Sequence, residues 1–142
     1  MHKTFGTKED VHYLDREGAY LIPCQNSRIA VVQTSKGYFV LGGGLEKGES
    51  HLDCLQRECL EEVGRLPLVQ ERLCSAEAYI KHPTFGYFHP IQTYYLGELL
   101  EKKSDAIETD HVLRWVEYEQ LKGKMFVKMQ NWALEQLTNL IK

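Results

Sequence analysis

The sequence predicts a protein of the α/β class (α+β type), in which a mixed central β-sheet lies between helical layers. Three observations lead to this prediction. Short segments rich in β-branched and aromatic residues, bounded by turn residues, occur in both halves of the chain. A helix with clear start and stop signals separates the two groups. An amphipathic segment at the end of the chain predicts a second helix.

The part of the chain before the first helix contains several segments with the composition of strands. The polar residues 1–15 are expected to form either a lead-in strand or a loose arm. The remaining elements follow from β-branched runs and from the turn formers Asn, Ser and Gly between them. In order, they are a strand at 18–23, a turn at 25–27, a strand at 28–34, a turn at 35–37 and a short strand at 38–41.

Residues 50–64 carry the signals of one complete helix. Ser50 is a good N-cap, and Asp53 three residues later makes a capping-box-like pair with it. Gly64 suits the left-handed position after the helix, and Pro67 cannot continue it. The spacing predicts one narrow apolar stripe that faces the core, formed by Leu52, Leu55, Cys59 and Val63.

Three carboxylates share a neighbouring face of this helix. Glu58, Glu61 and Glu62 are spaced i, i+3 and i+4, which brings their side chains together. Like charges at this spacing destabilise a helix, and acids in its last turn oppose the helix dipole. A bound cation reverses the sign of both effects. Because the ligands would all be oxygen atoms, the cluster indicates Mg²⁺, with Mn²⁺ as a substitute.

The chain after this helix is expected to form a long hairpin, a further strand and a closing helix. The hairpin strands are expected at 69–81 and 86–99. Residues 101–110 are charged and predict a surface loop. A strand at 112–118, a short helical turn at 119–122 and the C-terminal helix follow. The apolar positions of that last segment are Phe126, Met129, Ala133, Leu137 and Leu140.

Length and composition predict one soluble domain that spans residues 1–142. The formal net charge of −3 argues against binding to nucleic-acid polymers. No segment resembles a membrane-spanning helix or a signal peptide, so we expect a cytoplasmic protein. The 4 cysteines lack metal-binding spacing and are expected to be reduced, mostly as core residues.

Residues 43–65, GGLEKGESHLDCLQRECLEEVGR, resemble the signature of the Nudix hydrolases, the MutT-like enzymes. That signature reads G-x5-E-x7-R-E-U-x-E-E-x-G-U, where U is a bulky aliphatic residue. Every glycine, acid and arginine of the pattern is present at its spacing. Cys59 and Arg65 replace two of the aliphatic residues, and Leu41 stands where many members have proline. None of these departures affects a charged position.

The resemblance implies an α/β/α sandwich and a hydrolase that cleaves a phosphoanhydride bond in a nucleoside diphosphate linked to another moiety. Such an enzyme uses a divalent metal and water. Carried over to this chain, the residues that resemble the metal ligands are Glu58, Glu61, Glu62 and the backbone carbonyl of Gly42. Either Glu58 or Glu61 would orient or deprotonate the attacking water. Glu49 and Arg57 resemble the pair that bridges the loop to the helix.

Candidate substrate-binding residues are less specific. Residues 82–95 are rich in aromatic side chains, which could stack on a nucleobase, although aromatics also favour ordinary sheet packing. Phe85, in the expected loop, is the first candidate for stacking. The other candidates are Arg28 and Lys36, which could reach a phosphate, and Glu108 and Asp110, which stand where the family often places a further acid.

Three classes of function remain open. The favoured class is a metal-dependent hydrolase of nucleotides, such as an oxidised nucleoside triphosphate, with ADP-ribose and dinucleoside polyphosphates as alternative substrates. A non-catalytic Nudix-like sensor would bind a nucleotide without cleaving it, but such proteins typically lose motif acids that are intact here. An interaction module built on an acidic helix predicts no specific metal binding. The expected partner is a small nucleotide, and the expected assembly is a monomer or a homodimer without membrane association.

Overall fold

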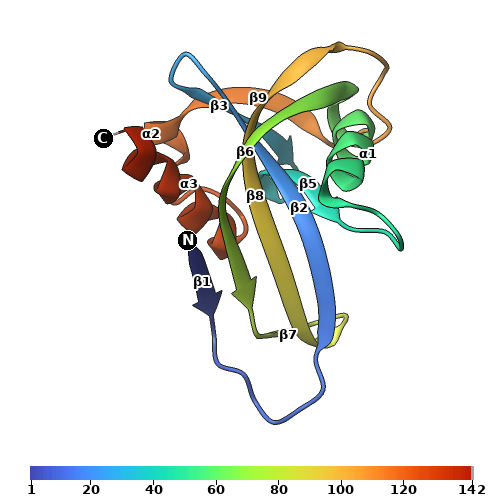
Figure 1. Cartoon of the computed structure of the whole chain (residues 1–142), viewed down its shortest axis with the longest axis vertical. Helices are drawn as coiled ribbons and strands as arrows, with labels where there is room; N and C mark the ends of the chain where they lie inside the picture. Colours follow the sequence, from blue (N-terminus) through green and yellow to red (C-terminus); the bar gives the residue numbers. More distant parts are fainter. Residues whose placement is uncertain (142) are drawn as a thin grey trace.

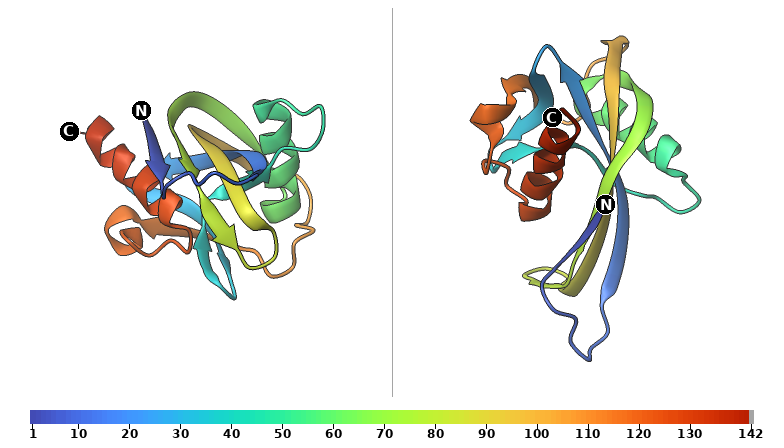
Figure 2. Two further views of the ribbon diagram at one scale, coloured as in Figure 1. Left: turned by 90° about the horizontal axis from the view of Figure 1, so that it is seen from below. Right: turned by 60° about the vertical axis from the view of Figure 1, so that its left-hand side comes forward.

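The fold has a mixed β-sheet between two helical layers, as the sequence predicts. The computed structural model describes residues 1–141, with side chains described as far as residue 139. The helix α1 (His51–Val63) packs on one face of the sheet, and α3 (Lys128–Ile141) lies on the other (Figure 1). Two further views show the helices on opposite sides of the strands (Figure 2). The predicted α+β class is therefore confirmed.

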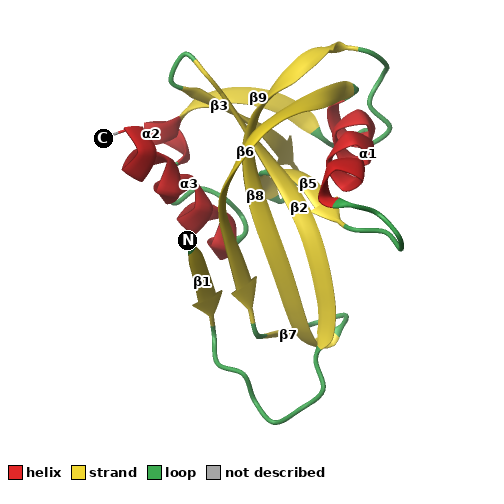
Figure 3. Cartoon of the chain, viewed as in Figure 1, coloured by secondary structure: helices red, strands yellow, loops and turns green. Residues whose placement is uncertain are grey.

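Strands make up most of the chain before and after α1 (Figure 3). Those before it are β1 (His2–Phe5), β2 (Leu14–Gln25), β3 (Arg28–Thr34), β4 (Gly37–Phe39) and β5 (Leu41–Gly44). Those after it are β6 (Arg65–Ala78), β7 (Ile80–His82), β8 (Gly86–Lys102) and β9 (Val112–Glu117). The short helix α2 (Tyr118–Leu121) connects β9 to the segment before α3.

The long strands β2, β6 and β8 form the middle of the sheet. The order is β1-β6-β8-β2-β3-β4, with β5 beside β2, β7 beside β8 and β9 beside β3. β2 runs parallel to β8, whereas β6 runs antiparallel to it. β5 runs antiparallel to β2 and places Gly42 opposite Tyr20. Since β5 also contacts α1, the three glycines of residues 42–44 belong to the part of the sheet against which the helix packs.

Two hydrophobic clusters hold the helices to the sheet. One lies between α1 and the sheet, and the other lies between α3 and the sheet. Leu21 and Ile22 are successive residues of β2 and belong to different clusters, because side chains alternate across a strand. β2 is therefore buried on both faces where it passes between the helices.

The predicted apolar stripe of α1 is wrong at its first position. Leu52 is 50% exposed, whereas the other three positions of the stripe are buried. Cys54 and Glu62 are buried as well. The helix packs on β5 through the face that contains Cys54, whose thiol lies 3.4 Å from the carbonyl oxygen of Gly43. Compared with the predicted stripe, the buried face of α1 is rotated about the helix axis, so that Leu52 faces solvent and Glu62 faces the protein interior.

Other element boundaries differ in detail from the prediction. The N-terminal arm forms a strand over His2–Phe5, which pairs with β6. The strand predicted at 38–41 is split, because Val40 donates its N–H to Gln130 Oε1 and β4 and β5 pair with different neighbours. α3 begins at Lys128, so Phe126 precedes it and is exposed. Leu140 lies outside the described side chains. Within the described residues, no helix has the length and apolar character to cross a lipid bilayer.

Candidate active site

Local signals determine where α1 begins and ends. Ser50 Oγ accepts a hydrogen bond from the Asp53 N–H at 3.1 Å, and Asp53 Oδ2 accepts one from the Ser50 N–H at 3.1 Å. Gly64 adopts the left-handed conformation (φ 69°) and donates its N–H to the carbonyl of Leu60 at 3.0 Å. The helix that carries the motif carboxylates is thus held at both ends.

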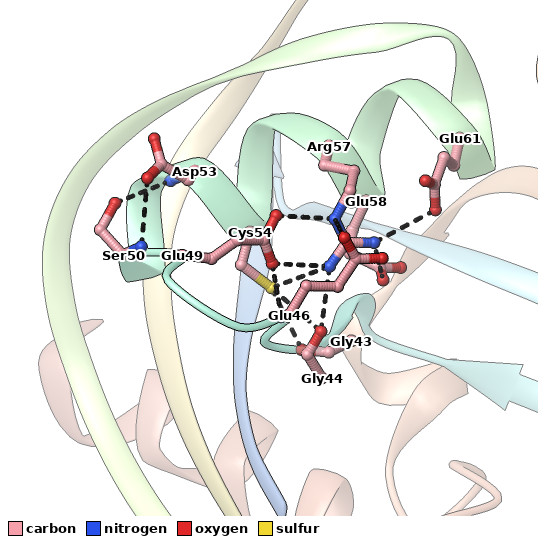
Figure 4. Close-up of polar contacts among 10 residues, drawn as sticks. All are labelled: Gly43, Gly44, Glu46, Glu49, Ser50, Asp53, Cys54, Arg57, Glu58 and Glu61. Carbon is pink, nitrogen blue, oxygen red and sulfur yellow. Dashed lines mark hydrogen bonds and ion pairs between the residues drawn. The ribbon is translucent and has the colours of Figure 1, made fainter.

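Arg57 ties the loop before α1 to the helix (Figure 4). Its Nε and Nη2 donate to the two carboxylate oxygens of Glu49 at 2.7 and 2.8 Å, and Nη2 also donates to the carbonyl of Gly44 at 3.0 Å. The guanidinium holds the pKa of Glu49 at about 2, well below its usual value. Because a bidentate pair of this kind is strong and directional, it fixes the loop against α1.

Glu58 lies directly against the glycine turn. A Cβ atom at Gly43 would stand 2.6 Å from the carboxyl carbon of Glu58, so only glycine permits this approach. Glu58 Oε1 accepts a hydrogen bond from Arg57 Nη1 at 2.8 Å. Burial raises the pKa of Glu58, and Arg57 opposes that effect. Glu61 lies one turn farther along and contacts the same Arg57 Nη1 through Oε2 at 3.4 Å.

Glu62 is buried, with 5% of its surface exposed. Its Oε1 accepts a 2.9 Å hydrogen bond from the Gly42 N–H, and its Oε2 lies 3.3 Å from Nδ1 of His111. Burial raises the pKa of Glu62 to about 8, and the charges of Glu58 and Glu108 add to this effect, while the Gly42 bond opposes it. When no cation is bound, burial therefore favours the protonated form of this carboxyl group.

The loop between β8 and β9 docks on the C-terminal end of α1. The N–H groups of Ile107 and Glu108 donate to the carbonyl of Glu61 at 2.8 and 3.0 Å, which satisfies a helix-end acceptor. A Cβ atom at Gly64 would stand 1.9 Å from the carbonyl oxygen of Ser104, so close docking requires glycine at this position. The docked loop brings Asp110 and His111 to the cavity that Glu58 and Glu62 line.

A cavity of about 410 Å³ opens beside Glu58 and Glu62, towards the start of α3. Besides these two acids, its lining includes Asp110 and His111, the cation of Lys36, the aromatic rings of Tyr20 and Phe39, and the amides of Gln92 and Gln130. A second cavity of about 500 Å³ lies between the β2–β3 hairpin and α3, but it contains none of the motif carboxylates. Only the first cavity combines the motif acids with groups that suit a nucleotide.

The structure separates the predicted substrate-binding residues. Asp110 lines the cavity, and ligand atoms of Glu108, Asp110 and His111 lie within 4.8 Å of one another. Arg28 is not brought to this site, because it stands at the opposite end of β3 and lines the second cavity. Phe85 does not reach the site either, because it is exposed in the β7–β8 turn, at the end of the sheet far from α1 (Figure 1). Lys36, by contrast, lines the cavity.

Sequence reasoning misses several residues of the cavity wall, among them Tyr20, Phe39, Gln92, Gln130 and His111. Alternation along β2 could have placed Tyr20 on the face opposite Ala19 and Leu21. His111 could have been named as a candidate site residue, because it directly follows the candidate acid Asp110. Gln92 is the residue of the aromatic segment 82–95 that lines the cavity. Gln130 has no comparable signal, since its role depends on where α3 packs.

Comparison with known families assigns this fold and motif. The model of the NUDIX domain matches residues 14–138. The chain belongs to the Nudix family. The expectation of an enzyme of the Nudix hydrolase type, which acts on pyrophosphate bonds, is thereby confirmed. A search of the curated proteins found no match.

Several solved structures share the fold of this Nudix chain at low sequence identity. A MutT NUDIX hydrolase from Burkholderia pseudomallei is 20% identical, with a TM-score of 0.73 over 87% of this chain and 98% of that one. A NUDIX hydrolase from Nitrosomonas europaea is 18% identical, with a TM-score of 0.70 over 89% and 90%. The dihydroneopterin triphosphate pyrophosphohydrolase of E. coli is 16% identical, with a TM-score of 0.62 over 84% and 92%.

Nudix enzymes generally use a divalent metal, and the groups around Glu62 fit one. The buried carboxyl of Glu62 accepts one hydrogen bond, at Oε1. Nδ1 of His111 is buried and has no hydrogen-bond partner among the described residues. Buried polar atoms are normally paired, so these atoms indicate a bound group. With Glu58, Gly42 and Asp110 in the same cavity, the donor set suits a divalent cation.

Proposed function

We propose that this Nudix enzyme hydrolyses a phosphoanhydride bond in a nucleoside diphosphate linked to another moiety, with Mg²⁺ as cofactor and Mn²⁺ as a substitute. The observation that carries the proposal is the convergence of Glu58, Glu62 and Asp110 on one cavity. A polyphosphate would be repelled by these acids unless cations neutralised them. Acidic side chains lining a cavity of nucleotide size are therefore best explained by a metal-bound phosphate substrate.

The proposed metal ligands are Glu58, Glu61, Glu62 and the carbonyl of Gly42. When bound, the cation would neutralise phosphate oxygens and lower the pKa of a bound water towards about 7. Of the two candidates for the group that orients the attacking water, Glu58 lines the cavity and Glu61 does not, which favours Glu58. The hydrogen bonds between Arg57 and Glu49 would hold the loop before α1 against the helix during turnover.

The remaining cavity wall suits a nucleotide. Lys36, Tyr20 and Phe39 line the cavity, which supports a contact of Lys36 with a phosphate and packing of the two rings against a base. The amide NH2 groups of Gln92 and Gln130 can donate hydrogen bonds to its edge, since their oxygens already accept from Tyr94 and Val40. A volume of about 410 Å³ lies within the range of small-molecule sites. A nucleoside triphosphate is the favoured substrate, ADP-ribose and a dinucleoside polyphosphate are the alternatives, and the partner is a small molecule rather than a nucleic-acid polymer.

The test is a hydrolysis panel in which phosphate and pyrophosphate are measured separately with saturating Mg²⁺. The panel includes ordinary and oxidised nucleoside triphosphates, ADP-ribose and a dinucleoside polyphosphate. It also includes a pterin triphosphate and a UDP-linked substrate, because two structural relatives are named as a dihydroneopterin triphosphate pyrophosphohydrolase and a UDP-X diphosphatase. Metal-dependent release from one substrate, lost in E58Q and E62Q, supports the proposal. Nucleotide binding without release would instead identify a sensor.

A further inference from the structure

We infer that His111 supplies a nitrogen ligand to the divalent cation of this site, which makes the site prefer a transition metal such as Mn²⁺ to Mg²⁺. The inference rests on the proposed function, because it assumes that a cation binds beside Glu62. The family signature supplies oxygen ligands alone. An imidazole nitrogen would change the selectivity of the site, since Mg²⁺ strongly prefers oxygen, whereas transition metals accept imidazole.

The spacing of His111 and Glu62 is compatible with two ligands of one ion. Nδ1 of His111 lies 3.3 Å from Glu62 Oε2, an ion-pair distance when the histidine is protonated, but the orientation of the two groups makes no hydrogen bond at Nδ1. Ligand atoms at roughly 2.1 Å from a cation, at right angles to each other, are separated by about 3 Å. A cation between these two atoms would therefore need only a small adjustment of either side chain.

The other ring nitrogen of His111 faces a carboxylate. Nε2 lies 3.8 Å from Oδ1 of Asp110. A metal-bound histidine usually directs its second nitrogen to a carboxylate, which fixes the tautomer and leaves the first nitrogen free for the metal. Asp110 is placed for this role, and ligand atoms of Glu108, Asp110 and His111 lie within 4.8 Å of one another. His111 therefore lies between the carboxylate of Asp110 and the buried carboxyl group of Glu62, as expected for a metal-binding histidine whose second nitrogen contacts a carboxylate.

The backbone holds His111 in this position. Its N–H donates to the carbonyl of Glu108 at 3.2 Å, and the N–H of Glu108 donates to the carbonyl of Glu61 at 3.0 Å. The imidazole is thus attached, through two backbone hydrogen bonds, to the helix that carries Glu62.

The experiment uses the full chain with Mn²⁺ alone and no nucleotide. Pulsed electron paramagnetic resonance of bound Mn²⁺ should show coupling to an imidazole ¹⁴N in the wild-type protein, and ¹⁵N-labelled histidine should replace it with ¹⁵N coupling. H111Q should lose the coupling and bind Mn²⁺ at least about tenfold more weakly by calorimetry, with a smaller loss for Mg²⁺. The matched control is H51Q, because His51 bonds to Glu17 and Tyr95 outside the cavity.

Each outcome separates the inference from the proposed function. Specific Mn²⁺ binding without nitrogen coupling in the wild-type protein overturns the role of His111 and leaves the metal-dependent hydrolase intact. Coupling that persists in H111Q also overturns it, because another nitrogen must then be the ligand. The absence of any specific Mn²⁺ or Mg²⁺ binding overturns both. If circular dichroism shows that H111Q does not fold, H111N takes its place under the same criteria.

Discussion

The backbone N–H of Gly42 donates a 2.9 Å hydrogen bond to Oε1 of Glu62 and so joins β5 to the last turn of α1. This bond favours the ionised carboxylate, but burial disfavours it more, and the pKa of Glu62 is raised to about 8. In the metal-free enzyme, burial therefore favours the protonated, neutral form of this carboxyl group. A cation that binds Glu62 must displace that proton.

Replacing Glu62 with glutamine should separate metal binding from folding. Glutamine copies the protonated carboxyl group, and its amide oxygen can still accept the Gly42 hydrogen bond. We expect E62Q to melt at or above the wild-type temperature without metal and to bind Mg²⁺ more than roughly tenfold more weakly. Calorimetry and thermal denaturation measure the two effects. E46Q is the control, because Glu46 is exposed in the loop before α1, and equal Mg²⁺ affinity in E62Q and E46Q would contradict the prediction.

The raised pKa of Glu62 also predicts how stability depends on pH. Below about pH 4.5 the carboxyl is protonated in both folded and unfolded chains, so it has no effect. Between about 4.5 and 8 the unfolded chain loses this proton while the folded chain keeps it, so the free energy of unfolding falls as pH rises. The decline attributable to Glu62 is at most about 1.4 kcal/mol per pH unit.

Urea denaturation in the presence of a chelator, at several pH values across this range, measures the effect. The wild-type protein should lose stability relative to E62Q as pH rises, because the glutamine does not titrate. Added Mg²⁺ should oppose the loss, since the cation favours the ionised carboxylate. Parallel pH profiles for the two proteins would show that Glu62 titrates normally.

The glycine turn offers a pair of substitutions that test the position of Glu58. In G43A the new Cβ would stand 2.6 Å from the carboxyl carbon of Glu58, whereas in G44A it would meet the guanidinium of Arg16. Arg16 is exposed and can move away, but Glu58 is held by Arg57. We expect G43A to lose roughly tenfold to a hundredfold in turnover and G44A to lose little. Similar turnover in both variants would refute the proposed position of Glu58.

Arg57 should be irreplaceable by lysine even though the charge is kept. Lysine cannot bond both oxygens of Glu49 and the carbonyl of Gly44 at once, as Arg57 does. We expect R57K to be destabilised by about 1–3 kcal/mol, the range for lost charged hydrogen bonds. R65K, at a half-buried arginine whose guanidinium bonds one backbone carbonyl, should change stability by less than about 0.5 kcal/mol. Chemical denaturation compares them, and equal stability would remove the structural role of Arg57.

The parts of the fold that depend on short-range chemistry could be predicted from the sequence. Ser50, Asp53 and Gly64 act within one turn of α1, and they mark its ends correctly. The turn at Asn26 and Ser27 is also local, since both residues adopt positive φ values (51° and 66°) of the kind that a two-residue hairpin needs. Such signals require no knowledge of what the element packs against.

The parts that depend on packing could not be predicted. Arg28 and Lys36 are similar in the sequence, but pairing places them at opposite ends of β3, and only Lys36 lines the cavity. The burial of Glu62 follows from the rotation of α1 on β5, which the apolar spacing of the helix does not specify. His111 reaches Glu62 because a loop docks on the helix, and no local pattern encodes that contact.

The last glycine of the signature has a consequence beyond ending a helix. The carbonyl of Ser104 occupies the space that a side chain at Gly64 would fill. The β8–β9 loop can therefore approach the end of α1 this closely only because Gly64 has no Cβ atom. An alanine there would push the β8–β9 loop away from α1, together with Asp110 and His111, which line the cavity beside Glu62. The shape of the candidate site is therefore partly controlled by a residue that does not line it.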